Sequence, residues 1–171
     1  LDYRYALMMH EFERIYVNNR IDTEVSEEEI SAYYRDNIEN FELDQNIARG
    51  LFVQIPKEAP KIARFRYLLR SGRPDDMEEL KSYCYRFANK AHLEDSVWMY
   101  FSDIALTIPM EDDVDEQAFF RANRYYETSD ESYHYFMKIS DYRLQGETSP
   151  LEFVADEIRK IIIHKRKVAI V

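Results

Sequence analysis

One residue in this chain combines a reactive side chain with a setting in which it could act on a bound molecule. His134 lies in the aromatic-rich segment 132–139, which predicts a β-strand. On such a strand His134, Phe136 and Lys138 would face the same side. An imidazole changes charge near neutral pH, so a functional role is one interpretation. The other is a half-buried strand histidine with an ordinary hydrogen-bond partner, and the sequence leaves both open.

The other reactive side chains form no recognisable catalytic or metal-binding pattern. Cys84 is the only cysteine, so no internal disulfide can form, and its place on a helical apolar stripe favours a buried, inert thiol. His10, His92 and His164 lack the spacing of metal ligands. There is no glycine-rich phosphate loop and no Gly-x-Ser-x-Gly motif. We therefore expect neither a metal nor a cofactor.

Charge and composition argue against nucleic acid as a partner and against a membrane-spanning segment. The net charge is −10, which argues against nucleic acid, because phosphates require a dominant basic face. No apolar run approaches the length of a membrane span. The chain begins at Leu1 rather than Met, which suggests a fragment whose targeting sequence is not included.

The stretch 47–92 departs from this acidic balance, with 10 bases and 5 acids. Either its basic face binds an acidic peptide or a phosphate, or it is a solvated helix surface. The face consists of Lys57, Lys61, Arg64, Arg66, Arg70 and Arg73.

Helical signals lie at both ends of the chain. Leu1, Tyr5, Met8, Phe12 and Ile15 repeat at helical spacing, which predicts an amphipathic helix to about Arg20. A second stripe follows a capping-box pattern at residues 149–152. Because each stripe needs a cover, we expect these two end helices to pack on each other.

The middle of the chain predicts an α+β unit. Strands are expected at 47–55, 97–101, 125–128 and 132–142, and helices at 58–71, 74–87, 103–108 and 117–122. The predicted domains are an N-terminal helical segment (1–46), an inserted domain (47–148) and a C-terminal helix (149–171).

A third helix carries a more specific signal. In 25–34, Ser26 and Glu29 form a capping box, and an apolar face from Ile30 continues to Phe41. This capped Val-Ser-Glu-Glu-Glu-Ile-x-x-Tyr-Tyr helix, followed by a strand, resembles the segment that leads into the isomerase domain of SurA-like folding factors. Those are parvulin-type peptidyl-prolyl isomerases with a helical chaperone part. The Tyr133-His134 strand is similar to the last parvulin strand, whose histidine faces the proline-binding cleft.

The resemblance implies a parvulin-like four-stranded sheet with helices, inserted between N- and C-terminal helices that pack together. It implies His134 as the catalytic residue, unfolded or proline-containing exported proteins as clients, and a periplasmic or cell-envelope location. The chain departs from the family at two points. Leu51 stands where the first-strand histidine is expected, and the glycine-rich middle segment is missing.

Proline isomerisation must lower a barrier of about 18–20 kcal/mol without making or breaking a bond. It needs an apolar slot for the ring and few donors to the carbonyl oxygen, because the twisted amide is less polar than the planar one. Aromatic and methionine side chains can supply such a slot, although they are also ordinary core residues. The candidate slot residues are Leu51, Trp98, Met99, Phe101, Met110, Phe119, Phe120 and Phe136.

Three functional hypotheses follow. The first is a prolyl isomerase with a reduced site around His134, and the second is a non-catalytic module that holds extended chains. The third is an acidic helical adaptor outside this family, which requires that no four-stranded sheet form between residues 47 and 142.

Overall fold

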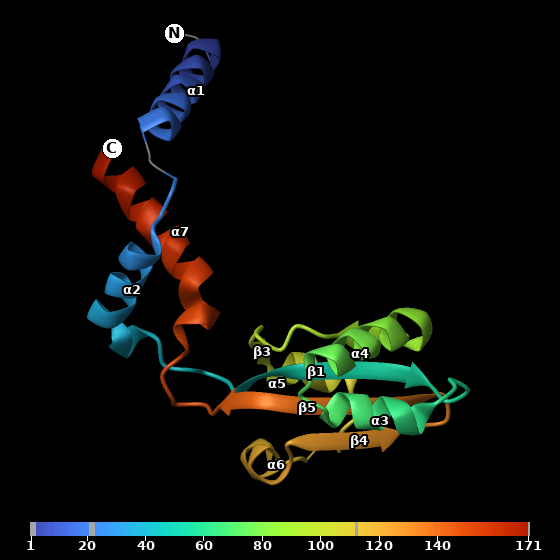
Figure 1. The fold of residues 1–171 in the computed structure, drawn as a ribbon. Coiled ribbons are helices and arrows are strands. Elements are labelled where there is room, and N and C mark those ends of the chain that lie inside the picture. The colour runs from blue at the N-terminus through green and yellow to red at the C-terminus, as the bar shows by residue number, and fades with distance from the viewer. Residues whose placement is uncertain (1–2, 21–22, 112, 171) are drawn as a thin grey trace. The chain divides into compact units, whose positions relative to one another are not determined.

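The computed structural model describes residues 3–20, 23–111 and 113–170, with the side chains of 16–20 and 170 left out. The chain forms two compact units (Figure 1). One contains the residues up to Glu42 together with those from Thr148 onward, and the other is Leu43–Glu147.

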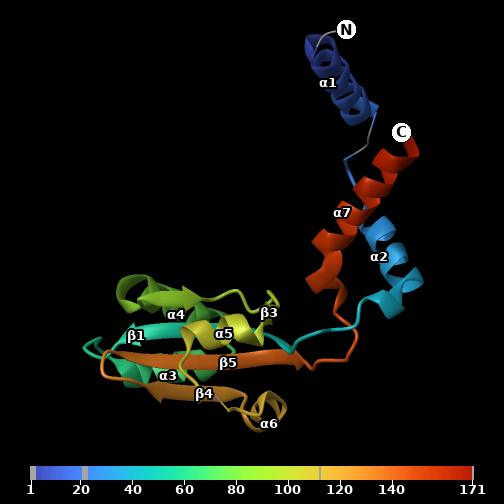
Figure 2. The ribbon, with the colours of Figure 1, turned by 180° about the vertical axis from the view of Figure 1, so that it is seen from behind.

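The first unit is held together by helices from both ends of the chain. Helix α2 (Glu27–Asp36), the short 3-10 helix η1 (Ile38–Asn40) and helix α7 (Leu151–Ile170) enclose an apolar cluster. The cluster is built from Ile30, Phe41, Val154 and Ile158. Figures 1 and 2 both show α2 alongside α7. The predicted packing of N-terminal on C-terminal helices is therefore confirmed for α2.

The start of α2 follows the predicted cap closely. The Glu29 backbone N–H donates to Ser26 Oγ at 3.1 Å. The reciprocal contact differs from the prediction, because the Glu29 carboxylate accepts from the Ser26 hydroxyl at 3.3 Å and from Arg166. Arg166 lies on α7, so the same carboxylate links the helix start to its packing partner.

Helix α1 (Tyr3–Arg20) forms as predicted and contacts α7, but the apolar stripe of α1 stays largely exposed. The side chains of Tyr5, Met8, Phe12 and Ile15 are 57%, 70%, 63% and 52% exposed, and Leu1 lies outside the described residues. The apolar face of α7 packs mainly on α2, because α2 presents the buried Ile30 and the half-buried Tyr33 and Tyr34. No helix in the described ranges has the length and apolar character needed to span a bilayer.

The second unit is built on an antiparallel sheet of five strands, one more than predicted. Strands β1 (Ile47–Pro56) and β5 (Tyr133–Arg143) pair along their length at its centre. The strand order is β2-β1-β5-β4, with β4 at Tyr125–Ser129 and the short β3 (Met99–Tyr100) pairing with the start of β1. Strand β2 (Lys90–His92) was not predicted, because three residues show no alternation. The adaptor hypothesis required that no such sheet exist, and it is wrong.

Helices cover both faces of this sheet (Figures 1 and 2). Helices α3 (Ile62–Arg70) and α4 (Pro74–Phe87) pack on the face that carries Leu51, Val53 and Ile55. Helices α5 (Phe101–Thr107) and α6 (Glu116–Ala122) pack on the other, with Phe52 and Met137. This α+β unit, inserted between helices from the two ends of the chain, is consistent with the SurA/parvulin-like fold predicted.

Candidate functional site

His134 lies near the start of β5, on the face covered by α3 and α4. Its cross-strand partners are Ile55 on β1 and Ser129 on β4. The ring lies 6.2 Å from that of Phe136, centroid to centroid, and is half-buried. Within the described part of the chain, its imidazole makes no hydrogen bond to another residue. No described residue therefore orients the imidazole of the candidate catalytic histidine through a hydrogen bond, although Ser129 lies across from it on β4.

The slot residues predicted to accompany His134 lie on both faces of the sheet. Leu51 and Phe136 share its face and are buried in the core under α3 and α4. The others in contact with the sheet lie on the opposite face, because α5, α6 and the segments next to them pack there. These are Met99, Phe101, Met110, Phe119 and Phe120.

The pairing of β1 with β5 also separates Leu51, which stands where the resemblance led us to expect a first-strand histidine, from His134. Leu51 pairs with Lys138, whereas His134 pairs with Ile55, four residues further along β1. Trp98 lies elsewhere again, with the guanidinium groups of Arg49 and Arg143 at 5.5 Å and 5.3 Å from its ring. The structure thus does not bring His134, Leu51 and Trp98 together.

Three of the predicted slot residues form an aromatic cluster under the sheet. The ring of Phe101 lies 5.9 Å from that of Phe119 and 5.2 Å from that of Phe120. Phe120 is 4% exposed and stacks on Tyr142 at 5.1 Å. Edge-to-face and stacked rings at these distances stabilise a core. Phe101 and Phe120 are therefore core residues that pack against neighbouring rings and do not line an open slot.

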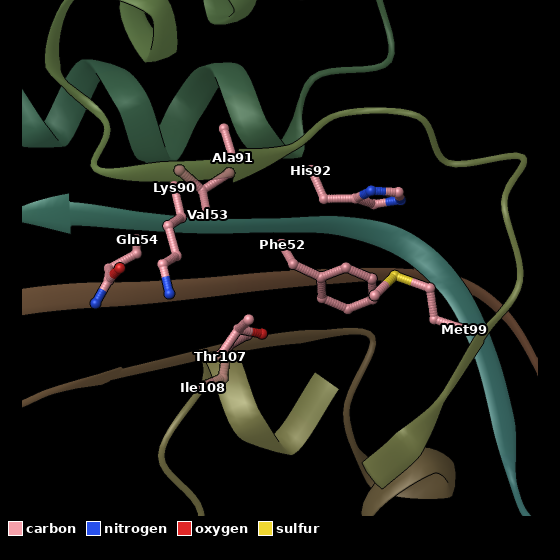
Figure 3. Close-up of a pocket in the computed structure, with 9 residues that line it drawn as sticks. All are labelled: Phe52, Val53, Gln54, Lys90, Ala91, His92, Met99, Thr107 and Ile108. Atoms are coloured by element: carbon pink, nitrogen blue, oxygen red, sulfur yellow. The ribbon is translucent and has the colours of Figure 1, made fainter. Parts of the chain in front are cut away.

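A hollow of about 150 Å³ opens beside this cluster, between β1, β2 and the end of α5 (Figure 3). Phe52 and Gln54 face His92 and Lys90 across the strand pair, and all four side chains point to the α5 face. Val53 and Ala91 also line the hollow, although their side chains point the other way in Figure 3. Met99, Thr107 and Ile108 complete the wall. Cavities of this size have taken up benzene in other proteins.

His92 forms one wall of this hollow without contributing a free polar group to it. Its ring stacks on Phe52 at 5.8 Å with an interplanar angle of 29°. Its Nε2 atom is buried and makes no hydrogen bond to the described residues. Because Nε2 is shielded from solvent, it does not face the open hollow. His92 thus lines the hollow with its ring and offers no accessible Nε2 atom there.

Sequence reasoning predicted only Met99 among the residues around this hollow. Phe52 stood in an apolar run that predicted the strand but not which side chains remain accessible. His92 and Lys90 gave no signal, because β2 exists only where it pairs with β1. No group of three His, Cys, Asp or Glu side chains in the described ranges converges on a metal position.

Cys84 lies in the core between α4 and the sheet and is 4% exposed. Burial raises the pKa of its thiol to about 11. An unfolded cysteine has a pKa of about 8.5. At pH 8 the fraction of Cys84 present as thiolate is therefore at least about a hundredfold lower in the native protein than in the unfolded protein. We expect a thiol reagent such as dithiobisnitrobenzoate to react at least that much more slowly with native than with urea-unfolded protein. Equal rates would contradict the burial of Cys84.

Comparisons with known proteins yield one similar structure. No protein-family model and no curated protein matches the chain. This solved structure is described as follows: the virulence factor PEB4 and the periplasmic protein Cj1289 are two structurally related SurA-like chaperones of Campylobacter jejuni. It matches 98% of this chain at a TM-score of 0.36 and 11% identity. This chain spans 65% of that protein's length, and the likeness assigns it no activity or client.

Proposed function

We propose that this protein is a folding factor that binds unfolded polypeptide segments, with weak or absent prolyl isomerase activity. The observation that carries the proposal is the apolar hollow of about 150 Å³ at the β2 side of the sheet. Phe52, Met99 and Ile108 offer it an apolar wall large enough for a proline ring or a small aliphatic side chain. An unfolded client exposes such side chains, whereas a folded protein buries them.

Two features favour binding over catalysis. His134 and the hollow belong to opposite faces of the sheet, so this histidine does not contact a ring held there. Lys90 and Gln54 also lie at the rim of the hollow, where their N–H groups can donate to a client carbonyl. Such donors stabilise the planar, polar amide more than the twisted one. These donors therefore strengthen the binding of a client without lowering the barrier to rotation about its prolyl peptide bond.

Helix α1 supports a role in binding apolar segments. It exposes seven large apolar side chains in the described part of the chain, which are Tyr3, Tyr5, Leu7, Met8, Met9, Phe12 and Ile15. Exposed apolar patches of this extent commonly mark interaction surfaces. We assign residues 1–46 and 149–171 to a chaperone-type helical part and 47–148 to the parvulin-like domain. The proposed clients are exported proteins in the periplasm or cell envelope, a location based on the sequence resemblance.

Filling the hollow tests this proposal. Thr107 lines it from the end of α5, so a Thr107→Trp substitution places an indole in the space for the client side chain. We expect at least a tenfold loss of affinity for a fluorescein-labelled, unstructured peptide rich in proline and leucine, measured by anisotropy. The matched control is Leu106→Trp, because Leu106 is 85% exposed on the same helix and lies outside the hollow. Unchanged binding by Thr107→Trp would exclude the hollow as the client site.

Catalysis is tested separately with a protease-coupled prolyl isomerisation assay. We expect the wild type to show little or no rate above background and the His134→Ala variant to equal it, while both suppress aggregation of an unfolded client. A clear rate that falls in His134→Ala would instead support an isomerase centred on that residue. Retention of the rate in His134→Ala but not in Thr107→Trp would support catalysis in the hollow.

A further inference from the structure

The outer groove between α3 and α4 concentrates positive charge on an otherwise acidic protein. The described residues that line it include three cations, Lys61, Arg64 and Arg86, and one carboxylate, Glu79, although the whole chain carries −10. The groove contains a hollow of about 170 Å³. It belongs to the side of the sheet opposite the hollow at β2.

The floor of this groove is apolar. Pro60, Leu68, Tyr83 and Phe87 line it, and the rings of Tyr83 and Phe87 lie 5.0 Å apart. The Tyr83 hydroxyl donates to the Pro60 carbonyl at 2.7 Å, so its polar end is already satisfied. The aromatic surface that remains is suited to an apolar side chain.

The rim of the groove carries cations without matching acids. Glu79 is the one carboxylate on the rim, and it accepts two hydrogen bonds from Arg64, at 2.6 Å and 3.2 Å. Lys61 and Arg86 also line the rim, and neither pairs with an acid in the described ranges. Two uncompensated cations therefore flank an apolar floor.

We propose that this groove binds an acidic polypeptide segment, in which an aromatic or aliphatic side chain is flanked by aspartate or glutamate. The apolar side chain covers Tyr83 and Phe87, and the carboxylates pair with Lys61 and Arg86. A free phosphate would leave the apolar floor uncovered. Nucleic acid would bring many phosphates to a protein with a net charge of −10. This site does not depend on the proposed client hollow at β2.

Lys61 allows the charge to be removed without harm to the fold. Its backbone has a φ of 59° and a ψ of 39°, in the left-handed region that asparagine tolerates better than lysine. Arg86 is exposed in the last turn of α4. A Lys61→Asn/Arg86→Gln variant should therefore keep the native circular dichroism and melting temperature. Arg86→Glu alone serves as a second variant in which Lys61 is untouched.

The probe is a fluorescein-labelled peptide with phenylalanine and leucine among aspartates and glutamates. We expect the double variant to bind it at least tenfold more weakly than the wild type, and Arg86→Glu to weaken it likewise. The matched control, Arg121→Gln/Arg124→Gln, removes the same charge in α6 and just after its end, and should bind as the wild type does. Added salt should weaken wild-type binding, and Thr107→Trp should leave it unchanged, which separates this site from the proposed client hollow.

Four results would overturn the proposal. The first is equal loss of affinity in the double variant and its matched control, and the second is equal affinity for a peptide with asparagine and glutamine in place of the acids. The third is complete displacement of the peptide by millimolar inorganic phosphate, which would indicate a simple anion site. The fourth is tighter binding of a single-stranded oligonucleotide than of the peptide at the same salt concentration.

Discussion

Replacing Gly50 by alanine is expected to lower the free energy of unfolding of the sheet unit by more than about 3 kcal/mol, or to prevent its folding. A Cβ atom at this position would lie 2.0 Å from the backbone oxygen of Lys138 and 3.1 Å from the Cα of Ile139. Both atoms belong to β5, so no side-chain rotation can relieve the contact. The β1–β5 pairing, at the centre of the sheet, would have to separate.

The register explains why the backbones approach so closely there. Arg49 pairs with Asp141 and Gly50 with Ile139, so Ser140 is an extra residue on β5. Such a bulge bends the strand and increases its twist, which brings the backbone of β5 toward β1. Only glycine offers the space, because it has no Cβ.

Urea denaturation followed by Trp98 fluorescence measures this effect, because Trp98 is the only tryptophan and lies in the sheet unit. The matched control is Gly72→Ala, at a glycine where an added Cβ meets no atom within 4 Å. That variant should be neutral or more stable by about 0.4–1 kcal/mol, through the lower entropy of its unfolded chain. A midpoint for Gly50→Ala equal to that for Gly72→Ala would contradict the predicted clash.

The elements with local signals could be predicted from the sequence. Ser26 and Glu29 determine the start of α2 within four residues, and the structure places the cap there. Strand β2 had no such signal, because Lys90–His92 is extended only where β1 offers hydrogen bonds. The stripe of α1 predicted a helix from spacing alone. Spacing does not show how much of a stripe becomes buried: α1 contacts α7, but most of its apolar side chains stay exposed.

The candidate site shows the same limit at the level of side chains. Alternation correctly grouped His134 with Phe136 on one face of β5. It did not show that α5 and α6 would cover the other face, because that depends on how distant segments return to the sheet. Met99 and Phe101 were therefore grouped with His134, although the sheet separates them. Phe52 and His92 meet only through the β1–β2 register, which no local pattern in the sequence determines.

The second large effect is expected at the α2–α7 packing. Ile158 is 0% exposed and lies in the cluster with Ile30, Phe41 and Val154. Ile158→Ala removes buried methylene and methyl groups and leaves a cavity, which costs about 2–5 kcal/mol. The helical unit has a small core, so this loss is a large share of its stability. The sheet unit does not use Ile158 in its clusters and should keep its own stability.

Amide hydrogen exchange separates these outcomes, because it reports the opening of each element. In Ile158→Ala, the amides of α2 and α7 should lose protection, whereas those of β1 and β5 should exchange as in the wild type. Met8→Ala is the matched control, since Met8 is 70% exposed on α1 and its truncation should change protection little. If Met8→Ala opened α7 as far as Ile158→Ala does, α1 would cover α7 as the stripes first suggested. Loss of protection confined to Ile158→Ala would establish α2 as the helix that holds the two ends of the chain together.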